Sequence, residues 1–329
     1  MGSDDLLGAA ELLRRATDVT ILAHVNPDAD ALGSALALGT ALRRRGVAVR
    51  VSFGAPGEVP RSLRGLDSDG LVVPAGAVPR AVQLLVAVDA GSAGRLGRLA
   101  DRVAATIACG GAVLVIDHHA SNTRFGTHHL VDERAEATVV LVARLLDELG
   151  VELDERIARC LYAGLVMDTS MFRRATPDTH RLAARLLEAG VDADALTRQL
   201  AGSHPFAWSR MLSAVLGRAQ LEPDAVAGLG LVHTEVRLAD MAGVGVEEVE
   251  SVVDILRTTI EAEVAVVLKE VAPGRWSGSL RAARRVDVCA AAVALGGGGH
   301  RLAAGFTAGG TAEEILAALR AALAQPVLI

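Results

Sequence analysis

The sequence is poor in aromatic residues. Phe, Trp and Tyr together make up 2% of the 329 residues, and only one of them is a tyrosine. Proteins that hold a long single-stranded nucleic acid usually stack its bases on several aromatic rings. The composition therefore argues against an extended base-stacking surface.

Cysteine and lysine are also scarce. Cys109, Cys160 and Cys289 lie far apart in apolar surroundings and form no Cys-x-x-Cys pair, which is typical of reduced, buried thiols in a cytoplasmic protein. Lys269 is the only lysine, and we attribute the preference for arginine to genome composition.

Positive charge is in deficit. The chain has 33 basic and 39 acidic residues, and its net charge is −6. Capture of long duplex nucleic acid relies on a basic surface, so this class of partner is disfavoured. A short, phosphate-bearing ligand held by a few local arginines stays compatible with the composition.

Long apolar runs are missing. No run reaches the ~18–20 residues that a membrane-spanning helix needs, and residues 1–16 begin acidic, without the apolar segment of a signal peptide. We therefore expect a cytoplasmic protein with no membrane partner. A hydrophobic content of 51% and this length favour a globular protein with two domains.

Apolar runs alternate with amphipathic segments in the first part of the chain. We predict strands at 19–25, 49–53, 84–88 and 113–116, and helices at 4–16, 31–45, 138–149, 154–166 and 177–189. Continuous apolar strands between helices indicate a doubly wound α/β domain with a parallel sheet.

The pattern restarts near residue 221. We predict strands at 229–233, 264–269 and 276–281, and helices at 246–259, 286–295 and 311–324, which together form a smaller α/β domain. The predicted division is an N-terminal domain at 1–188, a helical linker at 189–220 and a C-terminal domain at 221–329. In this arrangement, we expect the active site in the cleft between the two domains.

Polar residues that can bind metal ions follow four apolar segments. They are His24, Asp28 and Asp30 after the first strand, Asp89 after the third, Asp117, His118 and His119 after the fourth, and Asp168 after a helix. In α/β sheets, ligands bind at the carboxyl ends of strands. Carboxylates with two histidines favour Mn²⁺, with Mg²⁺ as the second candidate. A capping role for Asp28 and Asp30 is the alternative, but it leaves His24 unexplained.

These segments resemble the motifs of a known family. HVNPDADALGS, VAVDA, DHH and MDTSMF resemble the four motifs of the DHH phosphoesterase superfamily, and SLR, VDV and GGGGHRLAAGF look like its DHHA1 domain. The segment SHPFAWSRML resembles the family's inter-domain segment. Among the branches, the chain is most similar to the compact nanoRNase and pAp phosphatase group. It departs from many relatives at Ser170, where they carry glycine, and at Arg301.

The resemblance implies a site with two metal ions. His24, Asp28 and Asp89 would bind one ion, and Asp30, Asp89, His118 and Asp168 the other, with Asp89 as the bridge. Asp117 would orient a histidine ring, and His119 would face the phosphate or the leaving oxygen. The two ions would activate a water. Asn26 and Asn122 are candidate helpers, with a turn role as the alternative.

Apart from His119, the predicted substrate-binding residues lie in the second domain. Gly297, Gly298 and Gly299 can bring backbone N–H groups close to a phosphate, and His300 and Arg281 can add charge-assisted hydrogen bonds. A flexible turn is the alternative for the glycines. Arg95 and Arg98 are further candidates for phosphate contacts. For His128 and His129 we predict a surface loop.

The resemblance implies hydrolysis of short oligoribonucleotides, such as the dinucleotides pApA and pGpG, to mononucleotides. Dephosphorylation of pAp to AMP is the expected second activity, and cleavage of c-di-AMP stays open. The alternatives are a family II type inorganic pyrophosphatase, which shares the metal motifs, and a non-catalytic nucleotide-binding sensor. A processive exonuclease on long strands is disfavoured by composition. Compact members of the family are often homodimers, so we expect one here.

Overall fold

A computed structural model describes residues 3–201 and 204–329 of the chain. They form two compact units, Met1–Ser203 and His204–Ile329. Within residues 189–220, the first helix packs with the N-terminal unit and the second helix with the C-terminal unit. Ser203, which begins the segment SHPFAWSRML, lies outside the described residues.

The N-terminal unit is built on a five-stranded parallel sheet with the order β2-β1-β3-β4-β5. Its strands are β1 (Asp18–Ala23), β2 (Ala48–Phe53), β3 (Leu84–Val88), β4 (Ala112–Asp117) and β5 (His128–Val131). β1, β3 and β4 are almost wholly buried, as parallel strands covered on both faces must be. The predicted α/β fold is confirmed.

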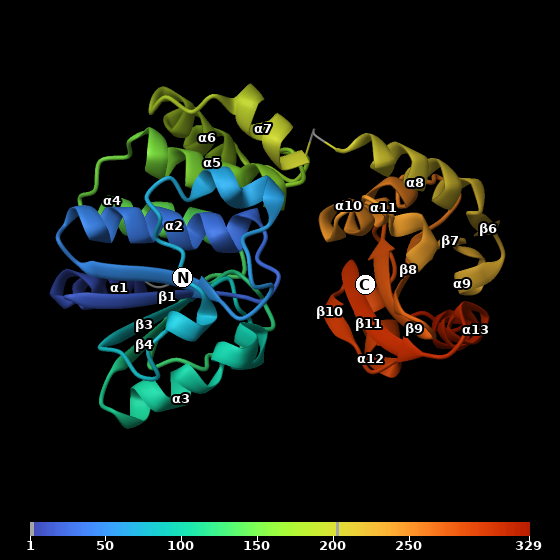
Figure 1. The fold of residues 1–329 in the computed structure, drawn as a ribbon, viewed down its shortest axis with the longest axis horizontal. Helices are drawn as coiled ribbons and strands as arrows, with labels where there is room; N and C mark the ends of the chain where they lie inside the picture. The colour runs from blue at the N-terminus through green and yellow to red at the C-terminus, as the bar shows by residue number, and fades with distance from the viewer. Residues whose placement is uncertain (1–2, 202–203) are drawn as a thin grey trace. The chain divides into compact units, whose positions relative to one another are not determined.

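Helices cover both faces of this sheet (Figure 1). They are α1 (Ser3–Arg15), α2 (Ala29–Arg44), α3 (Asp101–Ala108), α4 (Thr138–Glu148), α5 (Glu155–Asp168), α6 (Pro177–Glu188) and α7 (Ala193–Ala201), with short 3-10 helices at Arg61–Leu66, Ala75–Ala77 and Ala93–Leu99. α2 and α3 lie on opposite faces. One apolar cluster fills each side of the sheet.

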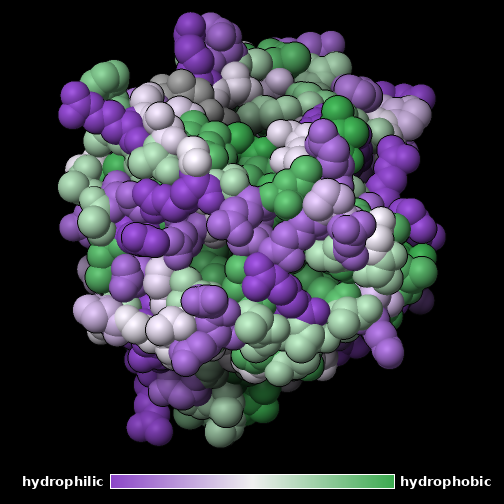
Figure 2. All heavy atoms as spheres, turned by 90° about the vertical axis from the view of Figure 1, so that its right-hand side faces the viewer, coloured by the Kyte–Doolittle hydropathy of each residue, from purple (hydrophilic) through white to green (hydrophobic). Residues whose placement is uncertain are grey.

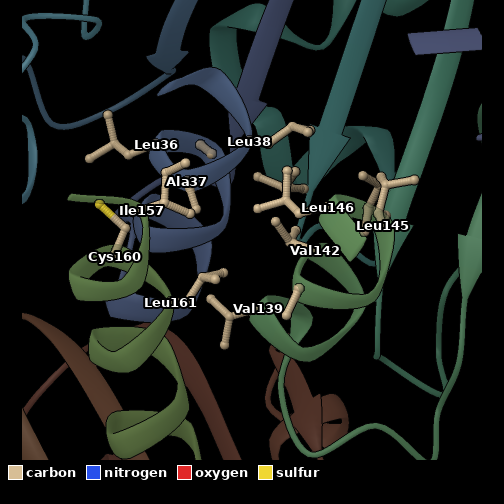
Figure 3. Packing of buried hydrophobic residues seen from close by; sticks show 14 of the residues in the cluster. Leu36, Ala37, Leu38, Val139, Val142, Leu145, Leu146, Ile157, Cys160 and Leu161 are labelled. Carbon is tan, nitrogen blue, oxygen red and sulfur yellow. The ribbon is translucent and has the colours of Figure 1, made fainter. Parts of the chain in front are cut away.

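α2 is buried along almost its whole length, between the sheet, α4 and α5. Figure 3 shows Leu38 of α2 beside Leu146 of α4, and Ala37 of α2 close to Ile157 of α5. The contact with α5 is close because of two glycines. A Cβ on Gly33 would stand 2.4 Å from the carbonyl oxygen of Cys160, and one on Gly164 would stand 2.9 Å from the Cα of Asp30.

The C-terminal unit has a six-stranded sheet with the order β10-β11-β9-β8-β7-β6, antiparallel except for β7 and β8. Its strands are β6 (Gln220–Glu222), β7 (Leu231–Val236), β8 (Val264–Ala272), β9 (Arg275–Ala282), β10 (Gly298–His300) and β11 (Ala303–Gly309). The helices are α8 (Phe206–Gly217), α9 (Ala225–Gly228), α10 (Val246–Glu250), α11 (Val252–Leu256), α12 (Val288–Ala294) and α13 (Ala312–Leu323), and a 3-10 helix spans Leu238–Met241.

Each face of the second sheet has its own core. α12 and α13 pack on the face that carries Val266 and Leu280, whereas α8, α10 and α11 pack on the face that carries Ala265 and Val267. Hydrophilic and hydrophobic residues are interspersed over the face that Figure 2 shows. Among the described residues, no helix is both long and apolar enough to span a membrane.

The structure corrects two sequence-based expectations and one alternative interpretation. The segment 246–259 contains two short helices interrupted at Ser251, not one. His128 and His129 belong to the edge strand β5 instead of a surface loop. The glycine run does not form a simple turn, because Gly298–His300 pairs with β11 as strand β10. Polar or glycine-rich edge strands carry little of the apolar alternation that marks a strand in a sequence.

Candidate active site

The carboxyl end of the parallel sheet gathers the acidic and histidine residues that the sequence predicts. Among the residues that the structure describes, three groups of side chains have ligand atoms within 4.8 Å of one another: His24, Asp28 and Asp89; Asp30, His118 and Asp168; and Asp89, His118 and His119. Asp89 and His118 each belong to two groups. All the predicted metal ligands therefore lie in one cluster within the N-terminal unit.

His24 directly follows β1 and is buried. Its Nδ1 lies 2.8 Å from the carbonyl oxygen of Val25, which directs Nε2 into the cluster. Nε2 is 3.4 Å from Oδ2 of Asp89 and 3.6 Å from Oδ2 of Asp28. These two carboxylates outweigh the effect of burial and raise the pKa of His24 to about 10.

Asp28 is the N-cap of α2, and its Oδ1 accepts hydrogen bonds from the backbone N–H groups of Asp30 and Ala31. Its Oδ2 faces His24. The capping interpretation is thus correct for Asp28, but it occupies only one of the two oxygens. The other oxygen stays in the cluster.

Asp30 is buried and lies against the start of α4. Its two oxygens accept hydrogen bonds from the backbone N–H groups of Thr138, at 2.7 Å, and Val139, at 2.9 Å. Oδ2 is also 3.9 Å from Nε2 of His118. Asp30 therefore caps a helix distant in sequence while facing the metal-competent residues.

Asp89 follows β3 and is the central residue of the site. Its backbone is in the left-handed region, with φ of 55°, and the Thr138 hydroxyl donates to its Oδ1 at 2.9 Å. Oδ2 faces His24, whereas Oδ1 lies 3.7 Å from Nε2 of His118. One carboxylate thus presents an oxygen to each half of the cluster, as a bridging ligand must.

Asp117, His118 and His119 follow β4. Nδ1 of His118 lies 3.2 Å from the carbonyl oxygen of Ala135, and its Nε2 is 3.5 Å from Oδ2 of Asp168. Asp117 is fully buried and accepts hydrogen bonds from Nδ1 of His119 at 2.6 Å and from Asn122 at 2.6 Å. The histidine ring that Asp117 orients is therefore His119.

Asp168 is the last residue of α5. Burial and the nearby carboxylates of Asp89 and Asp28 outweigh His118 and raise the pKa of Asp168 to about 6. Burial and the charges of Asp89 and Asp168 likewise raise the pKa of Asp30 well above its usual value. The negative charge of the carboxylates in the site is therefore not fully balanced by positively charged side chains. Divalent cations fit this donor set of carboxylates and imidazoles.

The segment after Asp168 has an unusual backbone. Ser170, Met171 and Phe172 all have φ in the left-handed region, at 54°, 56° and 63°. The hydroxyl of Thr169 donates to the carbonyl oxygen of Leu165, and the Phe172 ring packs between Tyr162 and His180. The chain is thereby turned sharply away from α5, directly behind Asp168.

Some site residues could not be identified from the sequence. Thr138 contacts both Asp30 and Asp89, yet in the sequence it is only the first residue of a predicted helix. Asn122 contacts Asp117, as a helper residue would, whereas Asn26 lies in a left-handed turn with φ of 52°. The guanidinium of Arg95 lies close enough to His119 to counteract the rise in the pKa of that histidine.

The predicted substrate-binding residues lie on the C-terminal unit. Ala303 of β11 is paired with Arg281 on one side and with His300 on the other. Paired residues project from the same face of a sheet, so Arg281 and His300 flank the small side chain of Ala303. Gly298, Gly305 and Ser279 form the neighbouring row on this face.

The three predicted glycines differ in their surroundings. A Cβ on Gly297 would stand 2.1 Å from the carbonyl oxygen of Gly305, and one on Gly299 would stand 2.6 Å from that of Ala303, so both allow close approach of β10 and β11. A Cβ on Gly298 would meet nothing within 4 Å. Only Gly298 thus leaves space over the sheet for a ligand.

Comparison with known proteins identifies the family. Residues 18–165 match the DHH family, N-terminal domain, and residues 232–325 match the DHHA1 domain. The chain therefore belongs to the DHH family and carries a C-terminal DHHA1 domain, which confirms the resemblance seen in its motifs.

Particular relatives extend this likeness over the whole chain. The bifunctional oligoribonuclease and PAP phosphatase NrnA of Thermus thermophilus is 33% identical, over 96% of this chain and 94% of its own length. The probable enzyme of the same name from Streptococcus mutans is 26% identical over 62% of this chain and 65% of its own length. The crystal structure of an exopolyphosphatase-related protein from Bacteroides fragilis has the same fold, with a TM-score of 0.89 and 22% identity, covering 98% of this chain and 96% of that one.

Proposed function

We propose that this protein is a metal-dependent phosphoesterase that hydrolyses short oligoribonucleotides. Dinucleotides such as pApA and pGpG would yield mononucleotides, and pAp would yield AMP. The observation that carries the proposal is the position of Asp89 between two groups of metal-competent residues. The likeness to the Thermus NrnA over nearly the full length of both chains supports this choice of substrates.

The residue types favour two Mn²⁺ ions, with Mg²⁺ as the second choice. His24, Asp28 and Asp89 would hold one ion, and Asp30, Asp89, His118 and Asp168 the other. Such ions supply activation of a water and neutralisation of charge on the phosphate oxygens. Asp30 and Asp89 are fixed by Thr138, so their oxygens are oriented before any ion binds.

His119 would contact the scissile phosphate or the leaving oxygen. Its ring is held by Asp117, which is itself held by Asn122. This chain of hydrogen bonds fixes which ring nitrogen faces the substrate, as buried carboxylates do for histidines in metal sites. Arg95 lies near His119 and would add positive charge toward a substrate phosphate.

Arg281, His300 and the glycines Gly297–Gly299 would bind the distal nucleotide or its phosphate. Arg281 and His300 project from one face of the sheet, so two basic side chains lie beside the row that contains Gly298. We assign direct approach of a ligand to Gly298 and a packing role to Gly297 and Gly299. The DHHA1 match at 232–325 supports a nucleotide substrate over pyrophosphate, and every predicted ligand is present, which disfavours a non-catalytic sensor.

The test is a substrate panel with Mn²⁺ and with a chelator. pApA, pGpG, pAp, c-di-AMP, pyrophosphate and a 24-residue RNA are compared by product release. We expect rapid, chelator-sensitive turnover of the dinucleotides and pAp and slow turnover of the long RNA, with c-di-AMP deciding whether cyclic dinucleotides are substrates. Turnover of pyrophosphate alone would overturn the proposal, and no turnover at all would favour the sensor.

Asp89→Asn tests the bridging role. Loss of one shared ligand affects both proposed ions, so we expect kcat to fall by about 10²–10³-fold, the scale seen when a key electrostatic group is removed from an active site. The matched control is Asp147→Asn, which removes a carboxylate of α4 that pairs with Arg185 at the surface. A fully active Asp89→Asn would contradict the assignment.

A further inference from the structure

Lys269 is the single lysine of the chain, and it is buried in the C-terminal unit. It lies on β8, where burial lowers the pKa of its ammonium group although Glu250 opposes the shift. A buried lysine carries a desolvation penalty that only specific partners offset. The groups that contact the Lys269 ammonium therefore indicate the role of this residue.

The ammonium group connects three elements. It donates to both carboxylate oxygens of Glu250, at the end of α10, and to the hydroxyl of Ser279 on β9 at 2.7 Å. The Ser279 hydroxyl also contacts Oε2 of Glu250, at 3.4 Å. Lys269 thus fixes α10 to the central strands of the sheet.

Arg281 follows Ser279 by two residues on β9, and the two side chains therefore project from the same face. The Arg281 side chain is mostly buried, with 25% of its surface exposed. Its Nε lies 3.9 Å from Oδ1 of Asp254. Asp254 belongs to α11, which follows α10 after a single intervening residue, Ser251. The position of Asp254 therefore depends on how α10 is fixed.

We propose that Lys269 is a positioning residue for the substrate-binding site: by holding Glu250 and Ser279, it sets α10 and α11 so that Asp254 orients the Arg281 guanidinium toward a substrate phosphate. The proposal rests on the function proposed above, in that Arg281 is taken to bind that phosphate. Lys269 itself contacts no substrate. Its effect is transmitted through Glu250, Asp254 and Arg281.

The test is a double-mutant cycle between Lys269 and Arg281. We expect Lys269→Met to raise the KM for pApA about tenfold, the effect of losing one charge-assisted hydrogen bond, with kcat nearly unchanged. In an Arg281→Met background, Lys269→Met should have almost no further effect on KM, because residues that act through one another are not additive. Equal effects in both backgrounds, or an unchanged KM in Lys269→Met, would overturn the proposal.

Two further variants separate positioning from stability. The variant that combines Lys269→Met with Glu250→Gln leaves no unpaired buried charge. It keeps the double-mutant cycle measurable if Lys269→Met alone is too unstable. We expect it to show the same rise in KM as Lys269→Met. The control is Arg320→Met, which breaks the ion pair of Arg320 with Glu222 on β6, at the opposite edge of the sheet from β10. We expect it to lower the melting temperature and leave KM unchanged.

A spectroscopic measurement does not depend on activity. The Nε–H resonance of Arg281, assigned by its loss in Arg281→Lys, should shift in Lys269→Met and stay in place in Arg320→Met. If the wild-type protein turned over none of the substrates, this resonance would still test the positioning role. A resonance that does not move in Lys269→Met would contradict that role whatever the substrate proves to be.

Discussion

Asp28 performs two tasks with the two oxygens of one carboxylate. One oxygen caps α2, and the other faces His24 in the proposed metal site. Asp30 combines the same two roles, but the helix that it caps is α4, 108 residues away in sequence. The N–H groups at a helix start are satisfied by such side chains, so the folding of α2 and α4 places these carboxylates in the site.

Ser170 shows where a single residue strains the backbone. Its φ of 54° lies in the left-handed region, where a residue with a Cβ is destabilised by roughly 1–2 kcal/mol. We expect Ser170→Gly to stabilise the N-terminal unit by about 0.5–1 kcal/mol, since glycine relieves this strain but gains entropy when unfolded. The measurement is the midpoint of urea unfolding.

Ser213→Gly is the matched substitution, for which we expect a change of opposite sign in the free energy of unfolding. Ser213 lies inside α8, where glycine weakens a helix by several tenths of a kcal/mol relative to serine. This variant should lower stability. If Ser170→Gly lowered the midpoint as well, the left-handed conformation of residue 170 would not be a source of strain.

At the scale of elements, the contact between α2 and α5 decides where Asp30 lies. Gly33 and Gly164 let the two helices approach, and Gly164 packs directly against Asp30 and Val139. α2, α4 and α5 thereby pack against one another through buried apolar side chains (Figure 3). Helix approach this close requires residues without a side chain at the contact.

Gly164→Ala tests this contact. A Cβ there would stand 2.6 Å from Cγ1 of Val139 and 3.0 Å from Oδ1 of Asp30. We expect a loss of about 1–3 kcal/mol in the free energy of unfolding, as overpacking usually gives, together with weaker activation by Mn²⁺. Unfolding and a Mn²⁺ titration of activity measure the two effects.

Gly8→Ala is the matched glycine substitution. Gly8 lies in α1, and a Cβ there would meet nothing within 4 Å. Alanine favours the helix, so stability should rise by about 0.5–1 kcal/mol with unchanged Mn²⁺ activation. A Gly164→Ala variant as stable and as readily activated as this one would contradict the packing argument.

At the scale of the whole molecule, two units have separate cores. The proposed metal ligands all belong to Met1–Ser203, whereas Arg281 and His300 belong to His204–Ile329. A ligand stabilises only the folded unit that binds it. Metal binding alone should therefore affect only the part of the unfolding profile that belongs to Met1–Ser203.

Calorimetry tests this division. We expect two unfolding transitions. Mn²⁺ at about 100 times its Kd should raise the free energy of unfolding of one of them by roughly 3 kcal/mol and leave that of the other unchanged. The fragment 204–329, produced alone, should reproduce the transition that Mn²⁺ does not move. A shift of both transitions by Mn²⁺ would mean that the units unfold cooperatively.

Local patterns carried much of the prediction. Apolar runs mark where the buried strands lie along the chain, and the polar residues after them mark the carboxyl ends of these strands. The four motifs revealed the family. Four strands were not predicted: the edge strands β5, β6 and β10, and β11, which lies between β10 and β9. β5 contains two histidines, β6 has three residues, and β10 and β11 each contain two glycines, so none of them shows the apolar pattern of a buried strand. The predicted helix at 246–259 is two helices, because the break at Ser251 has no glycine or proline to mark it.

The sequence by itself determined the fold class, the family and the residue types of the site, because these depend on local periodicity and on short motifs. Only the tertiary structure decided how those residues are held. Thr138 meets Asp30 and Asp89, and Asp117 orients His119 instead of His118. Lys269 finds its partners on another helix and strand. Such partners are chosen by packing between distant segments, which no local pattern encodes.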